Sequence, residues 1–148
     1  MVRAKGSEPQ DKRELAVCTR PVGPWTFTME LPARQTRHGV AFDAEDCIRM
    51  ENLIARWLID HIAVSRESLR FLRTTAGLKS KEFAELCGVV PDTVTRWEKG
   101  EQNFDRITWE FVARIADERL RGSTETLDRL RQPPYDGPKT IHLEFKAG

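Results

Sequence analysis

Residues 69–100 read LRFLRTTAGLKSKEFAELCGVVPDTVTRWEKG, and three glycines divide this stretch into short helical pieces. Gly77, Gly88 and Gly100 can each end a helix with a positive φ. Within each piece the apolar residues recur at helical spacing: Leu69 and Leu72, then Phe83, Ala84 and Cys87, then Val94 and Trp97. The pattern predicts three short amphipathic helices, the first capped by Ser65.

The second and third pieces are predicted to pack at a sharp angle. Ala84 is small where the helix over 79–87 must approach the helix over 91–99, and Gly88 permits the turn between them. A fourth helix over about 105–119 is expected to complete the core. We expect it to bury Ile107, Phe111, Val112 and Ile115, and to leave Trp109 free for an interface. Residues 123–131 are expected to add a last short helix.

These residues resemble the helix-turn-helix domain of the XRE (Cro/C1) family over about a third of the chain. The resemblance lies in LRFLR, GL, EFAELCGV and TVTRWEKG. It implies a five-helix DNA-binding domain whose third helix enters the major groove. The chain departs from the family pattern where Lys79, Ser80 and Val90 replace the usual capping and phosphate-binding residues.

Carried over residue by residue, the resemblance implies a set of DNA contacts. Arg96 is the main candidate, because a guanidinium can donate two hydrogen bonds to guanine O6 and N7. Asp92 either stabilises the first helical turn or accepts from cytosine N4. Ser80 and Lys81 would meet a phosphate at a helix amino end. The whole predicted DNA-binding set is Ser80, Lys81, Pro91, Asp92, Thr93, Thr95, Arg96, Lys99, Gln102 and Asn103.

The region before this domain combines a β segment with a long helix. Residues 25–31 alternate apolar and polar side chains until Pro32, and residues 39–42 are expected to form a second strand of a small hairpin. Asp43 can cap a helix with an apolar face. That face comprises Met50, Leu53, Ile54, Trp57, Leu58 and Ile62. Its packing partner could be the hairpin, the helical domain or a second copy of the chain.

This order of elements also resembles the YgiT-type (MqsA-like) antitoxins, on MELP, HGVAF, the long helix and LRFLR. The resemblance implies a toxin-contacting region, dimerisation and repression of the protein's own operon. It also implies that Cys18 and Cys47 are remnants of two zinc-binding CxxC pairs. The spacing of Cys18, His38, Cys47 and His142 does not suit a tetrahedral site, so no metal or other cofactor is expected.

The ends of the chain are predicted to be irregular or only partly ordered. Residues 1–14 are polar and charged, which is typical of a disordered tail. Residues 132–148 begin with a proline-rich linker and end in an alternating segment, Ile141, Leu143 and Phe145. This segment is expected to form a strand that joins the hairpin or pairs with another chain. The domains are thus expected to be 1–14, 15–64, 65–131 and 132–148.

The composition sets limits on the function. Of 148 residues, 39% are hydrophobic and 32% charged, with a net charge of +1 and three cysteines. The odd cysteine number argues against a disulfide framework, and no apolar run could span a membrane, so a cytoplasmic protein is expected. No catalytic motif is apparent, so we expect no enzyme.

The function indicated by these patterns is that of a DNA-binding transcriptional repressor, dimeric and autoregulatory, acting on a double-stranded operator. It could also be the antitoxin of a toxin-antitoxin pair. The alternative is a protein-binding module in which the helical domain is mainly a scaffold. Residues 69–122 hold ten basic and nine acidic residues, so affinity for DNA must come from local placement of charge or from dimerisation.

Overall fold

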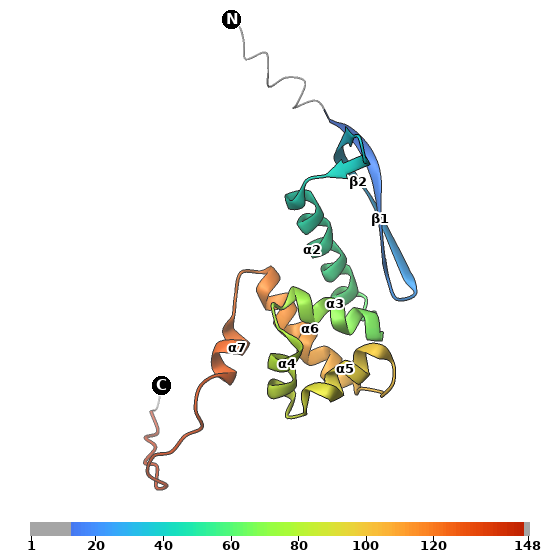
Figure 1. Cartoon of the computed structure of the whole chain (residues 1–148). Helices are drawn as coiled ribbons and strands as arrows, with labels where there is room; N and C mark the ends of the chain where they lie inside the picture. Colours follow the sequence, from blue (N-terminus) through green and yellow to red (C-terminus); the bar gives the residue numbers. More distant parts are fainter. Residues whose placement is uncertain (1–12, 147–148) are drawn as a thin grey trace, which may run out of the picture.

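The computed structural model describes residues 13–146, and Figure 1 shows a small sheet and a long helix joined to a helical domain. The strands are β1 (Glu14–Val22), β2 (Trp25–Thr36) and β3 (Gly39–Phe42). The helices are α2 (Ala44–Asp60), α3 (Arg66–Thr75), α4 (Ser80–Cys87), α5 (Pro91–Lys99), α6 (Arg106–Leu120) and α7 (Glu125–Leu130). No helix in the described part of the chain is long and apolar enough to cross a membrane.

The three strands form an antiparallel sheet in the order β1-β2-β3. Trp25, Phe27, Met29 and Leu31 are buried or half-buried on one face of β2, while the residues between them are exposed, as their alternation predicts. The prediction that Pro32 ends this strand is wrong, because β2 continues to Thr36. Up to Pro32, β2 has a strand neighbour on one side only, and such an edge tolerates a proline.

The strand β1 was not predicted, and it changes the N-terminal boundary. The predicted tail includes Glu14, yet β1 begins there, and Arg13 forms an ion pair with Asp43. The rest of that prediction, for residues 1–12, lies outside the described residues. Alternation along β1 is interrupted by Arg20 and Pro21, so its sequence gives a weaker strand signal than that of β2.

Helix α2 packs into the same core as the helical domain. Met50, Ile54, Ala55 and Leu58 are buried in one cluster with the residues of α3 to α6. The mainly helical class is confirmed: the described residues hold six helices, the long α2 and five more after it, and the predicted hairpin is a sheet of three strands. The apolar face of α2 is narrower than expected, because Leu53 is 54% exposed and Ile62 lies beyond the helix with a φ of 52°.

A cluster of ion pairs around Asp117 connects α2 with α6. Arg56 Nη1 lies 2.6 Å from Asp117 Oδ1, and Arg121 also pairs with this carboxylate. Burial raises the pKa of Asp117, but hydrogen bonds from Arg121 and Arg56 and their charges outweigh burial and hold the pKa below its ordinary value of 3.8. The ionised carboxylate therefore stabilises the folded state above about pH 3.8, and this contribution is lost as the pH falls through the lowered pKa.

We expect Asp117→Asn to lower the free energy of unfolding by about 2 kcal/mol at pH 7, because the charge-assisted hydrogen bond from Arg121 and the ion pair with Arg56 are lost. Urea unfolding at several pH values should show this difference shrinking as the pH falls below 3.8. Asp60→Asn is the matched control: Asp60 also meets Arg56, at 3.5 Å, but it is exposed and should contribute less than about 0.5 kcal/mol. Equal losses in both variants would contradict a special role for Asp117.

The start of α3 carries a set of polar contacts, of which the hydrogen bond between Trp109 and Ser68 is buried. Ser65 caps the helix by accepting from Ser68 N–H, as predicted, and Ser68 Oγ accepts from Ser65 N–H in return. Ser68 Oγ also accepts a hydrogen bond of 2.9 Å from Trp109 Nε1. The expectation of a free Trp109 is therefore wrong: its side chain is fully buried, and Ile107, expected in the core, is 80% exposed.

The chain after α7 does not form the predicted strand. Residues 133–146 have no helix or strand and are exposed throughout. Ile141, Leu143 and Phe145 are 57%, 83% and 93% exposed. A single added strand needs a neighbouring edge for its backbone hydrogen bonds, and within this chain the segment lies at no such edge.

Candidate nucleic-acid interface

Helices α4 and α5 are joined by a tight turn that sets their angle. Gly88 ends α4 in the left-handed conformation, with a φ of 71°, and Val89 N–H donates to Ala84 O at 3.0 Å. Val90 is the N-cap residue of α5 without a side-chain cap, and Pro91 occupies the first helical turn. Because that turn needs no N–H from Pro91, the proline offsets the missing cap.

Most of the predicted DNA-binding residues are exposed along α5 and in the loop after it. Arg96 is exposed and forms no ion pair with any residue between 13 and 146, so its guanidinium can turn to a base edge. Thr95 is also exposed, but its Oγ1 donates to Pro91 O at 3.4 Å within the helix. Ser80 and Thr93 are half-buried, whereas the other exposed members are Lys81, Pro91, Asp92, Lys99, Gln102 and Asn103.

The amino end of α4 brings backbone amides and a lysine charge together. Lys79 N–H donates to Glu82 Oε1 at 3.0 Å, which satisfies the N-cap amide. The amides of Ser80 and Lys81 belong to the first turn, where a helix offers no carbonyl partner. Backbone N–H groups and the Lys81 charge therefore lie at the same helix end, a favourable place for an anion.

A buried ion pair that the sequence does not reveal fixes the orientation of α5. Arg73 Nε and Nη2 donate to Glu98 at 2.6 and 3.0 Å, and Arg73 Nη1 donates to Leu78 O at 2.8 Å. The side chains of Arg73 and Glu98 are only 13% and 11% exposed. One guanidinium thus links α3, the turn before α4, and α5, so Arg96 is presented on a helix held rigidly against its domain.

We expect Glu98→Gln to lower the free energy of unfolding by about 3 kcal/mol, because Arg73 would keep a poorly hydrated charge without its counter-ion. Chemical denaturation followed by circular dichroism measures this loss. Glu101→Gln, in the exposed loop after α5, is the matched control and should change stability by less than about 0.5 kcal/mol. A loss as small for Glu98→Gln as for the control would show that the pair does not hold α5.

A second residue that the sequence does not reveal, Arg66, holds the carboxyl end of α5 at Lys99. Its Nη1 donates to Lys99 O at 2.7 Å, and its side chain lies against Gly100, which has a φ of 78°. A Cβ at Gly100 would meet Arg66 Nη1, which this exposed and flexible side chain could avoid, so it is the left-handed conformation that favours glycine here. The sequence could not predict this contact, because the acceptor is a backbone carbonyl, which any residue at position 99 would supply.

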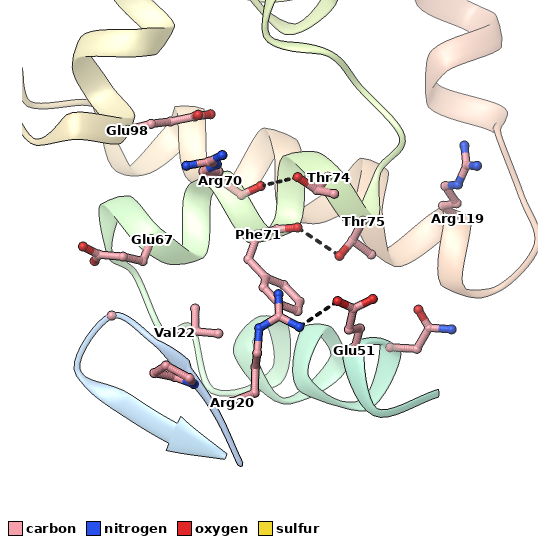
Figure 2. Close-up of a pocket in the computed structure, with 13 residues that line it drawn as sticks. Arg20, Val22, Glu51, Glu67, Arg70, Phe71, Thr74, Thr75, Glu98 and Arg119 are labelled. Carbon is pink, nitrogen blue, oxygen red and sulfur yellow. Dashed lines mark hydrogen bonds and ion pairs between the residues drawn. The ribbon is translucent and has the colours of Figure 1, made fainter. Parts of the chain in front are cut away.

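The hairpin tip and the helical domain enclose a groove of about 580 Å³, shown in Figure 2. At one side Arg20 Nη1 lies 2.7 Å from Glu51 Oε2, and its guanidinium stands 5.4 Å from the centre of the Phe71 ring. At the other side Glu98 reaches the groove from α5. The groove therefore lies between the N-terminal region and the helix expected to read DNA, and Arg20 ties the two regions together.

The three cysteines are not among the predicted DNA-binding residues. Cys18 and Cys47 are half-buried free thiols on β1 and α2, and Cys87 at the end of α4 is half-buried against the core. Burial raises the pKa of the Cys87 thiol. Among residues 13–146 the structure contains no group of three or more His, Cys, Asp or Glu side chains placed to hold a metal ion.

Comparison with known proteins agrees with this geometry. Residues 66–130 match a family model described as a helix-turn-helix domain. The match runs from the first residue of α3 to the last residue of α7. No curated protein and no solved structure shows significant similarity to the chain.

Proposed function

We propose that the protein is a transcriptional repressor that binds its own operator as a dimer, because residues 66–130 match a helix-turn-helix domain. The observation that carries the proposal is the exposed, unpaired Arg96 on α5, a helix fixed against its domain by the Arg73–Glu98 pair. In this type of domain the third helix enters the major groove. We propose regulation, and no catalysis, as its role.

Electrostatic attraction alone would not hold this domain on DNA. The near balance of basic and acidic residues in 69–122 leaves few charges for phosphate neutralisation. Two domains bound side by side would double the number of contacts, and dimers of such domains bind half-sites about one helical turn apart. The proposed operator is therefore a two-fold site.

A gel shift with DNA from the region upstream of the coding sequence tests the proposal. Saturable binding to this DNA, in excess over an unrelated duplex at the same salt concentration, supports an autoregulatory repressor. Equal binding to both duplexes would contradict sequence-specific repression. The salt concentration must be held fixed because phosphate contacts make affinity strongly salt-dependent.

We propose as a second role that the protein neutralises a toxin through its N-terminal region. The favouring observation is that sheet and α2 expose apolar side chains away from the proposed DNA surface, among them Leu15, Val17 and Ile48. Co-expression with the product of the adjacent gene, followed by purification, tests this role. Recovery of the neighbour with wild type, but not with Val17→Asp, would support it, whereas no recovery with wild type would contradict it.

A further inference from the structure

The strand β2 has an open edge. Its residues Ala33 to Thr36 pair with β3, but no strand within residues 13–146 pairs with the second edge from Trp25 to Pro32. That edge reads WTFTMELP and has no lysine, and no proline before its last residue. Natural edge strands usually carry such residues, because an uncovered, β-prone edge invites pairing with another chain.

The other long edge of the sheet, formed by β1, carries blocking residues and has a neighbouring helix. The outer edge of β1 holds Arg20 and Pro21, and β1 lies against α3. From Trp25 to Leu31, the open edge of β2 therefore has no proline, no basic residue and no paired strand among the described residues.

An apolar flank of α2 lies beside this edge. Helix α2 packs under β2, with the Trp57 ring 5.3 Å from that of Phe27. Leu53 lies one turn before Trp57 on the same helix face, yet Leu53 is 54% and Trp57 36% exposed. Because β1 lies on the α3 side of β2, a strand added to the open edge would extend over this flank of α2.

The C-terminal segment has the properties that this edge requires. Residues 140–146 read TIHLEFK, with Ile141, Leu143 and Phe145 alternating with polar side chains. These three side chains are exposed and have no packing partner in the described chain, although their spacing is that of a one-faced strand. Seven residues span about 23 Å as a strand, close to the length of the open edge.

We propose that residues 140–146 of one copy add as a strand to the open edge of β2 in a second copy, and that the exchange is reciprocal. Ile141, Leu143 and Phe145 then face Leu53 and Trp57 of that copy. The second copy is favoured because the segment leaves α7 on the side of the helical domain away from the hairpin (Figure 1). Reciprocal exchange closes a two-fold dimer. This dimer does not depend on DNA binding, so each proposal can fail without the other.

The test compares Leu143→Asp with His142→Asp in the full chain. Both variants place the same charge in the same exposed segment, but only Leu143 is on the face that the added strand would bury. We expect the dimer dissociation constant, measured by analytical ultracentrifugation, to rise about 100-fold for Leu143→Asp, because two leucine contacts are lost per dimer. Amide hydrogen exchange of residues 25–31 should become at least tenfold faster at the same protein concentration.

A His142→Asp variant that stays dimeric, with slow exchange at residues 25–31, supports the proposal. A monomeric wild type whose residues 25–31 are protected, and lose protection in Leu143→Asp, would show that the segment covers the edge of its own chain and would overturn the exchange. A dimer that Leu143→Asp leaves unchanged would overturn it too, since the interface then lies elsewhere.

Discussion

Replacing Arg96 with alanine is expected to weaken operator binding about 10- to 100-fold, which corresponds to the loss of one bidentate contact with a guanine. Arg96 is exposed on α5 and forms no ion pair with the described residues, so the substitution removes no contact that holds the fold. Fluorescence anisotropy with a labelled operator at fixed salt measures the change. The unfolding free energy should remain within about 0.5 kcal/mol of wild type.

The matched control is Arg49→Ala, which removes an exposed arginine of α2 away from α4 and α5. Both variants lose one positive charge, so a general electrostatic effect would weaken binding equally in the two. The specific role predicts that only Arg96→Ala lowers discrimination between the operator and a duplex with a changed guanine. Unchanged affinity and sequence preference in Arg96→Ala would overturn the assignment of α5 as the recognition helix.

The parts of the fold that the sequence predicted well are those specified locally. Gly88 and Gly100 have left-handed conformations that glycine favours, and Ser65 caps α3 through its own side chain. The alternation from Trp25 to Leu31 fixes which face of β2 packs on α2. Each of these signals depends on a few neighbouring residues and is therefore readable without the rest of the chain.

The features that were missed depend on contacts between distant residues. Arg73 and Glu98 are 25 positions apart, and nothing near either one distinguishes it from a solvated surface charge. The prediction of a C-terminal strand was wrong for a related reason. The local alternation predicts a strand, but a strand also needs the edge of another strand beside it, and within the described chain no edge lies next to this segment. Thus the helices that carry the candidate site could be predicted from sequence, but not the Arg73–Glu98 ion pair and the Arg66–Lys99 contact that hold α5.

Helix α6 is turned about its axis from the orientation that its apolar periodicity predicts. Ile107, Phe111 and Ile115 form an apolar row at i, i+4 spacing, which favours a helix with Ile107 in the core. In the structure the buried residues are instead Trp109, Val112, Ala113, Ile115 and Ala116. The buried face follows the larger Trp109 side chain, whose Nε1 finds a partner in Ser68 Oγ across the core.

Trp109→Ala is expected to lower the free energy of unfolding by about 3 to 5 kcal/mol, because it opens a large cavity in the core. It also removes the donor to Ser68, whose hydroxyl is fully buried. Ile107→Ala is the control from the same helix: with 80% of its surface exposed, Ile107 should contribute less than about 0.5 kcal/mol. Urea unfolding of both variants compares them directly. The opposite order of effects would mean that α6 packs as the periodicity predicts, with Ile107 in the core and Trp109 at an interface.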